Sequence, residues 1–307
     1  MSQVGHFFVG LAPDFRGPGV RVGRPFGVKS SGSGRIHFQL ALRCRAAGIW
    51  TDMRFRFAGL LGLGLFSIHA LTAQVTETPQ TVAPGKLRFE IDGLRLAYDR
   101  ADAAGNKVTG VAVASTIVTA GITESFDVQA GLDLFLRRSV EFRGRRDSRA
   151  GIGDLYFRAK WTFWRDQGRG AALAVMPYVK IPSNSAGLGN DAVEGGLIFP
   201  WAMKTGEGVT AGAMLRWDMV RNDDDNGYDA RWHLSGYVQQ DITKMLAAYA
   251  EGLLSLYSTG FSQWQGGVGV GLLCQVTKSI QLDYEIMRGL NRRATDWQHI
   301  FRVNWDW

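Results

Sequence analysis

Long uninterrupted apolar runs are nearly absent from this sequence. A membrane-spanning helix needs about 20 consecutive apolar residues, and a single stretch comes near that length, which excludes a polytopic helical membrane protein. Cysteine is scarce as well: Cys44 and Cys274 cannot staple a chain of 307 residues, which excludes a disulfide scaffold. An apolar content of 46% with 11% aromatic residues excludes a disordered chain.

The one apolar run has the features of a secretory signal peptide. Arg54 and Arg56 follow a second methionine, Met53, and the apolar stretch Phe57–Ile68 comes next. Small residues close the run at Ala70–Ala73, as a signal-peptidase site requires. The run is too short for a membrane span, so we expect residues 53–73 to be cleaved.

Two flanking segments follow from this interpretation. Residues 1–52 are rich in Gly and Arg without helical or strand periodicity, and we interpret them as an upstream extension from a misassigned start codon. A long, unusual leader is the alternative. Residues 74–85 are expected to form a short periplasmic segment before a barrel that spans residues 86–307.

The net charge of +7 belongs entirely to residues 1–73, the extension and the signal peptide. Residues 1–73 contain nine basic and two acidic residues, so 26 charges of each sign remain in residues 74–307. A neutral chain has no electrostatic reason to bind nucleic acid, and we expect no nucleic-acid partner.

From residue 86 onward, polar and apolar residues alternate. Within 154–163 the odd-numbered residues are all apolar, and the even-numbered ones are polar or tyrosine. Because a strand points alternate side chains to opposite faces, this segment is predicted to be a two-faced strand. The first strand changes phase near Gly93, as a β-bulge would cause. The pattern predicts twelve strands, at 87–98, 108–121, 126–140, 152–164, 171–182, 192–204, 209–220, 231–241, 245–257, 264–276, 280–291 and 297–307.

The connections between these strands alternate between short turns and longer, more polar loops. The loops include Glu141–Gly151 and Ser183–Asp191, whereas the turns include Ile122–Ser125. This asymmetry is typical of outer-membrane barrels, whose turns are periplasmic and whose loops are extracellular. We therefore predict an all-β fold, an up-and-down transmembrane β-barrel of about twelve strands in a Gram-negative outer membrane, with both termini periplasmic.

A soluble β-sandwich would also alternate, but three features count against it. The apolar face persists on nearly every strand, and the opposite face carries charges of both signs at mid-strand, as a wet lumen allows. Several tryptophans lie near predicted strand ends, among them Trp164, Trp232 and the terminal Trp307, as in an interfacial girdle.

Four short motifs resemble one outer-membrane family. They are the string Gly151–Leu155, Lys160, the segment Met176–Pro182 and Ile280–Asp283. Together they resemble the family labelled "putative MetA pathway of phenol degradation", and the resemblance covers most of residues 86–307. It implies a signal peptide, a mid-sized barrel and transport of small, often aromatic or apolar, molecules. It supplies no catalytic positions.

The polar faces of the strands predict a lumen with balanced charge. Nine acidic and nine basic residues are expected to point inward, which suggests ion pairs across the lumen and modest charge selectivity. Tyr156, Tyr178, Tyr237 and Tyr249 are expected to offer a stacking surface or to fill the lumen. The principal lumen-lining candidates are Asp133, Arg137, Asp154, Tyr156, Arg158, Lys160, Tyr178, Lys180, Arg216, Asp218, Arg231, Glu251, Asp283, Glu285 and Arg302.

The chain offers little for catalysis or metal binding. His233 and His299 lack metal-ligand spacing, and a relay of Ser235, His233 and Asp241 is a weak candidate for nucleophilic catalysis. The loop 223–227 lacks the bidentate Glu of a calcium loop. The arginine-rich segment 143–149 could attract anionic lipopolysaccharide or lie free in solvent. We expect no cofactor, no metal and no enzymatic activity.

The function that follows is a passive channel for small, including aromatic or apolar, molecules. A closed-lumen structural or surface-interaction barrel is the first alternative, and an outer-membrane lipid hydrolase is the second. The partners expected are outer-membrane lipid and lipopolysaccharide, a small-molecule solute, and the barrel-assembly machinery through the C-terminal strand.

Overall fold

The structure, a computed structural model, describes residues 76–100, 107–142, 145–189, 191–222, 227–257 and 260–307. The expected extension (1–52), the signal peptide (53–73) and most of the acidic loop (223–226) lie outside these ranges. The domain boundaries proposed from the sequence at this end of the chain therefore stay predictions.

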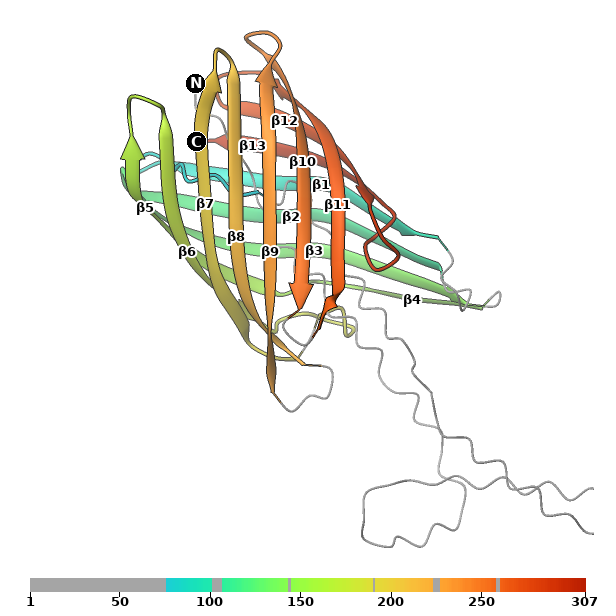
Figure 1. Ribbon diagram of the computed structural model, residues 1–307. Helices are drawn as coiled ribbons and strands as arrows, with labels where there is room; N and C mark the ends of the chain where they lie inside the picture. Colours follow the sequence, from blue (N-terminus) through green and yellow to red (C-terminus); the bar gives the residue numbers. More distant parts are fainter. Residues whose placement is uncertain (1–75, 101–106, 143–144, 190, 223–226, 258–259) are drawn as a thin grey trace, which may run out of the picture. The chain divides into compact units, whose positions relative to one another are not determined.

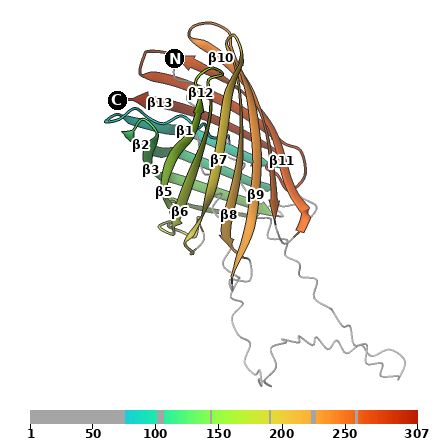
Figure 2. The same ribbon diagram turned by 60° about the vertical axis from the view of Figure 1, so that its left-hand side comes forward.

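Twelve antiparallel strands close into a ring (Figures 1 and 2). With β4, which lies outside the ring, the strands of the described residues are β1 (Leu87–Asp99), β2 (Lys107–Thr123), β3 (Phe126–Phe142), β4 (Arg145–Gly151), β5 (Leu155–Asp166), β6 (Ala171–Ile181), β7 (Glu194–Gly206), β8 (Val209–Arg221), β9 (Tyr228–Asp241), β10 (Leu246–Tyr257), β11 (Gly260–Gln275), β12 (Ile280–Gly289) and β13 (Trp297–Asp306). Within the ring each strand pairs with the one before it and the one after it, β3 pairs directly with β5, and β1 pairs with β13. β4 stays outside the ring and pairs with β3. The predicted up-and-down barrel of twelve strands is confirmed.

β4 is the one strand that the sequence did not predict. It pairs with the last residues of β3, from Leu136 to Phe142, whereas β5 pairs with the first part of β3. β4 and β5 thus both pair with β3, each along a different part of its length, and residues 152–154 separate the two strands. The arginine-rich segment expected to be a loop is therefore partly a strand, with three of its arginines on β4: Arg145, Arg146 and Arg149.

The two ends of the barrel differ. At one end, here called the turn end, hairpins such as 124–125 and 207–208 join the strands. The other end, the loop end, carries the longer connections 182–193 and 290–296. β1 begins and the chain ends at the turn end, where the Leu87 and Trp307 backbones exchange hydrogen bonds of 3.1 and 2.9 Å.

At the loop end, an exposed ion pair joins two connections. The Arg100 guanidinium lies 2.6 Å from the Asp296 carboxylate, linking the end of β1 to the β12–β13 loop. The hydrogen bonds from Arg100 hold the pKa of the Asp296 carboxyl below its usual range.

Large apolar side chains cover the outside of the ring. Trp161, Leu234 and Val270 are each more than half exposed, and similar exposed apolar residues lie on most other strands of the ring. Such a belt would be costly in water and is favourable against lipid chains. Among the described residues, no helix is long and apolar enough to span a bilayer.

The alternation shifts phase along one line across β1, β2 and β3. The β1–β13 register shifts between Asp92 and Leu94, which confirms the phase change predicted near Gly93. Ala114 on β2 has a φ of 54°, and both Leu134 and Phe135 on β3 are exposed. Beyond this line, toward the loop end, the faces of these strands are exchanged.

Candidate functional site

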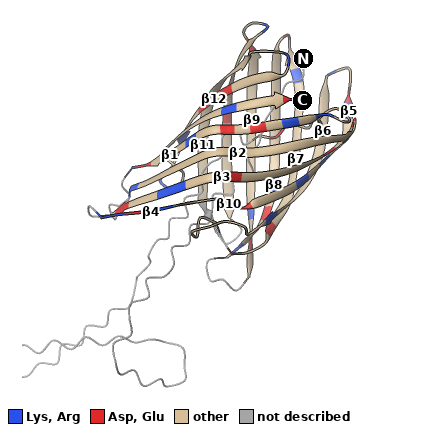
Figure 3. Cartoon of the chain, turned by 180° about the vertical axis from the view of Figure 1, so that it is seen from behind, with Lys and Arg blue, Asp and Glu red and all other residues tan. Residues whose placement is uncertain are grey.

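The inner wall of the barrel is polar and buried. Figure 3 shows that Lys and Arg, as well as Asp and Glu, are distributed along the strands. Fourteen of the fifteen lumen-lining candidates are buried: Asp133, Asp154, Tyr156, Arg158, Lys160, Tyr178, Lys180, Arg216, Asp218, Arg231, Glu251, Asp283, Glu285 and Arg302. Because their strand neighbours form the exposed outer belt, these side chains point to the inside of the ring.

Arg137 is the exception. It lies beyond the phase shift at Ala114, on the exposed outer side of β3, and its Nε donates to the Ser148 hydroxyl of β4 at 3.0 Å. Simple alternation from Asp133 places it inside, but the exchange of faces at Leu134 and Phe135 turns it outward. Arg137 is therefore not a lumen residue.

Asp218 of β8 is the centre of the largest polar cluster on the wall. Its carboxylate accepts from the Tyr178 hydroxyl at 2.6 Å and lies 3.1 Å from the Arg216 Nε. The second oxygen lies 3.2 Å from Arg231 and 2.9 Å from the His233 Nε2. Asp218 is fully buried, and two guanidinium groups, an imidazole and a hydroxyl surround its carboxylate and offset the cost of burying the charge.

His233 also contacts a serine, but not the one predicted. Its Nδ1 lies 2.6 Å from the Ser255 Oγ of β10. The structure thus forms the chain Ser255–His233–Asp218, whereas Ser235 lies near Thr76 and Asp241 lies at the turn end. The order resembles a nucleophile, a base and an orienting acid. However, all three members lie on the inner wall, and the acid is shared with two arginines.

A second cluster joins β13 to both of its neighbours. Arg302 lies 2.7 Å from Asp92 of β1 and 3.3 Å from Asp283 of β12. The Tyr249 hydroxyl of β10 donates to Asp283 at 3.0 Å. These pairs, like those of Asp218, connect adjacent or nearby strands. The two clusters thus join charges on the same, adjacent or nearby strands, where cross-strand pairing brings opposite charges together, whereas the sequence predicted ion pairs across the lumen.

The β6–β7 loop folds against the wall at the loop end. Lys180 lies 3.2 Å from Asp154 and 2.9 Å from Glu194. The second oxygen of Asp154 accepts from the backbone amides of Ser183 and Asn184, each at 3.1 Å. Leu188, fully buried, packs in one cluster with Ala112 and Leu136, which the phase shift has turned inward.

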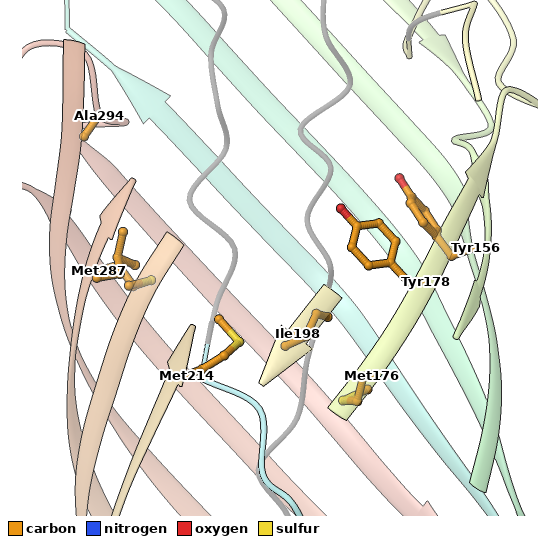
Figure 4. Packing of buried hydrophobic residues seen from close by; sticks show 8 residues of the cluster. Tyr156, Met176, Tyr178, Ile198, Met214, Met287 and Ala294 are labelled. Atoms are coloured by element: carbon orange, nitrogen blue, oxygen red, sulfur yellow. The ribbon is translucent and has the colours of Figure 1, made fainter. Parts of the chain in front are cut away.

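Apolar residues interrupt the polar wall in one patch. Met176, Ile198 and Met214 are buried on β6, β7 and β8, in one cluster with Tyr156 and Tyr178 (Figure 4). Methionine is flexible and polarisable, and it adapts to varied apolar shapes. This apolar patch could contact the apolar part of a solute.

The other two tyrosines of the predicted stacking surface lie against glycines. Tyr237 pairs with Gly212 across β8 and β9, and Tyr249 pairs with Gly271 across β10 and β11. A Cβ placed on either glycine would lie 2.3 or 2.2 Å from the facing ring. Both tyrosines are buried, so they fill the wall and leave no ring face open for stacking.

The segment before β1 runs inside the ring and contacts the inner wall. The Thr76 backbone amide donates to the Glu251 carboxylate of β10 at 2.7 Å, and the Thr76 hydroxyl lies 2.7 Å from the Ser235 hydroxyl of β9. Glu77, almost fully buried, lies 3.2 Å from Arg158 and 3.4 Å from Lys160 of β5.

The rest of the segment continues along the wall toward the turn end. The Thr162 hydroxyl donates to the Pro79 carbonyl, and the Lys160 ammonium donates to the Gln80 carbonyl at 3.1 Å. The Val82 amide donates to Asp127 of β3 at 3.2 Å. In the ring of twelve, β3 and β10 are six positions apart. Residues 76–82 therefore contact opposite walls and cross the bore.

A tight turn aims this segment inward. In Ala83–Lys86 the Lys86 amide donates to the Ala83 carbonyl at 3.0 Å, and Gly85 has a φ of 73°. Proline at the second and glycine at the third position are the preference of a type II turn. Gly121 of β2 lets the chain pass, because a Cβ there would lie 2.1 Å from the Ala83 carbonyl oxygen.

A cavity of about 530 Å³ occupies the turn end beside this segment. Gln80 lines one side, and residues of β7–β13 and their turns line the others, among them Thr210, Gln239 and Leu273. This volume is within the range of small-molecule sites.

Sequence reasoning missed Glu77, Ser255 and the whole lumen segment. The segment is not a strand, so alternation carries no information about it. The one signal in the sequence is the pair of bases Arg158 and Lys160, which lie two residues apart on the same face of β5. Among the described residues, no group of three or more His, Cys, Asp or Glu could hold a metal ion.

A closed ring with an apolar exterior and a charged, buried interior defines the class: a transmembrane β-barrel of the outer-membrane type. The chain belongs to the family described as "Putative MetA-pathway of phenol degradation", whose model matches residues 72–307. The family expected from the four motifs is therefore confirmed.

One solved structure shares the fold, and others are similar to the chain to a lesser degree. The COG4313 outer membrane channel from Pseudomonas putida F1 matches with a TM-score of 0.60 and 13% identity, over 74% of this chain and 97% of that one. The NanC porin matches with a TM-score of 0.43 and 12% identity, over 71% and 97% of the two chains. The translocator domain of the autotransporter NalP from Neisseria meningitidis gives 0.46 and 14%, over 72% and 88%. No curated protein matches the sequence.

Proposed function

We propose that the protein is a passive channel that lets small molecules cross the outer membrane. The observation that carries this proposal is the polar inner wall with a solute-sized cavity beside it, inside a ring whose outside suits lipid. The similar Pseudomonas protein is itself described as an outer membrane channel, which is consistent with this function.

Aromatic or apolar solutes with a polar group are the class that this lumen fits best. The patch of Met176, Ile198 and Met214 offers adaptable apolar contact. The cluster around Asp218 offers polar contacts beside this patch, and the cluster around Arg302 offers them on the strands across the ring. Balanced charge on the wall favours modest rather than strong ion selectivity.

The orientation proposed is the turn end toward the periplasm and the loop end outside. Short hairpins and both ends of the barrel chain lie at the turn end, as in outer-membrane barrels generally. The loops would then face lipopolysaccharide. The exposed terminal residue Trp307 would present β13 to the barrel-assembly machinery.

Proteoliposome swelling tests the channel. Liposomes containing the folded protein should swell in a neutral pentose and in benzoate, whereas liposomes with heat-unfolded protein should not. Comparing benzoate with a straight-chain carboxylate of equal charge measures the aromatic preference. No swelling in any solute would contradict the channel and favour the closed-lumen barrel, which the crossing of the bore by residues 76–82 supports.

One observation favours the lipid-hydrolase alternative: the hydrogen-bonded series Ser255–His233–Asp218. Its position on the inner wall offers bilayer lipid no approach to the Ser255 hydroxyl. A phospholipase assay on the intact protein and on Ser255→Ala separates the two functions. Hydrolysis that is lost in Ser255→Ala would favour the enzyme.

A further inference from the structure

Residues 76–82 are held in the lumen by contacts that a solute could replace. None of these residues belongs to a strand, and they contact the wall through side chains and single backbone groups. The turn at Ala83–Lys86 anchors the segment at one end. Displacing it would therefore break no strand pairing of the barrel.

Glu77 is the most specific contact of the segment. Its two carboxylate oxygens face different cations, Arg158 at 3.2 Å and Lys160 at 3.4 Å. All three side chains are more than nine-tenths buried. A carboxylate between a guanidinium and an ammonium in a buried site is the arrangement by which proteins bind carboxylate ligands.

We propose that Arg158 and Lys160 form a binding site for small carboxylate solutes, and that Glu77 occupies it in this closed state. A carboxylate solute entering the lumen competes with Glu77 for the same two cations. The segment 76–82 then leaves the bore while the turn at Ala83–Lys86 holds its end. The inference rests on the proposed channel function and adds to it a solute class and a gate.

The apolar patch places a hydrophobic surface near this carboxylate site. Met214 pairs across the strands with Ser235, the residue whose hydroxyl lies 2.7 Å from that of Thr76. On β6, which pairs with β5, Met176 and Tyr178 are buried on the inner face, and Tyr178 is the cross-strand partner of Arg158. A solute with a carboxylate at Arg158 and Lys160 and an apolar body toward Met176 fits this arrangement.

Currents in planar bilayers test the gate. Deleting residues 76–80 should raise the mean conductance, and Glu77→Gln should raise the open probability by about tenfold, the range expected for losing a hydrogen bond between charged groups. The matched control is Glu207→Gln, which removes an exposed carboxylate from the β7–β8 turn and should leave the current unchanged. Heat-dependent gel mobility confirms that each barrel is folded.

A synthetic peptide tests the carboxylate site. The peptide Thr-Glu-Thr-Pro-Gln-Thr-Val, the sequence of residues 76–82, should block the deletion variant. The same peptide with Gln in place of Glu should need about ten times the concentration. Benzoate should relieve the block by the Glu peptide, and less so in the double variant Arg158→Gln, Lys160→Gln.

The outcomes separate the gate from the channel. Equal conductance of the intact protein and the deletion variant overturns the gate and leaves the channel function standing. Equal block by the Glu and Gln peptides overturns the carboxylate site. If neither the intact protein nor the deletion variant conducts any current, the proposed function itself is overturned.

Discussion

Each buried tyrosine of β9 and β10 needs a glycine beside it. Tyr237 covers Gly212 and Tyr249 covers Gly271, so even a methyl group at these glycines would meet a ring. Gly212→Ala and Gly271→Ala should each lower the free energy of unfolding by about 1–3 kcal/mol, the usual cost of overpacking. Urea unfolding in detergent micelles, followed by tryptophan fluorescence, measures this loss.

Gly252 provides the matched control for both substitutions. It lies on β10 like Tyr249, but a Cβ there would meet nothing within 4 Å. Gly252→Ala should leave the midpoint nearly unchanged. A loss as large as that of Gly271→Ala would show that glycine itself, and not the facing ring, sets the stability.

Asp218 compensates two arginines on the inner wall. Asp218→Asn keeps the shape but leaves Arg216 and Arg231 without their shared carboxylate. Removing one partner of a buried ion pair costs about 3–5 kcal/mol, so the same urea unfolding should show a large loss. Asp191→Asn, at an exposed loop position, is the control. A loss below about 1 kcal/mol for Asp218→Asn would indicate that lumen water screens the pair.

At the scale of single strands, alternation predicts which face a residue takes only while the strand stays regular. Asp133 lies inside, but Arg137, four residues along the same strand, lies outside. The cause is the irregular line through Gly93, Ala114 and Phe135. On β3 this line coincides with the apolar run Leu134–Leu136, which interrupts the alternation. The bulge near Gly93 was visible in the sequence, but its effect two strands away requires the pairing register.

The β6–β7 loop depends on one buried leucine. Leu188 packs in one cluster with Ala112 and Leu136, and large-to-small changes at such sites cost about 2–5 kcal/mol. Leu188→Ala should release the loop and raise hydrogen exchange at the Ser183 and Asn184 amides by about tenfold or more. Val193→Ala, at a half-exposed side chain near the loop's end, should leave that exchange unchanged. Unchanged exchange in Leu188→Ala would contradict this anchoring role.

The elements of the ring could be predicted because one physical requirement repeats on every strand. A barrel wall must face lipid on one side and water on the other. Each membrane-crossing segment therefore alternates apolar and polar residues with a period of two. β4 was not predicted because both of its faces are solvent-exposed or only partly covered. Its sequence therefore needs no alternation of polar and apolar residues. Residues 76–82 escaped because their contacts depend on which walls face each other across the bore.

At the scale of the whole molecule, the barrel joins an apolar exterior, a charged inner wall and a segment that crosses the bore. Gln239 and Val238 are adjacent on β9 and differ only in face: Gln239 is buried and lines the cavity, whereas Val238 is 55% exposed on the outside. If solutes pass through the lumen, obstruction at Gln239 must reduce their flux and obstruction at Val238 must not.

The most direct test is a flux measurement with a bulky thiol reagent. Gln239→Cys and Val238→Cys are each made in a chain whose Cys274, the free cysteine among the described residues, is replaced by Ser. Each protein is placed in liposomes, treated with the reagent and assayed for swelling in a pentose. We expect modification to abolish most of the flux through Gln239→Cys and none through Val238→Cys. Equal flux through both proteins, with labelling of Gln239→Cys verified by mass, would contradict passage through the lumen.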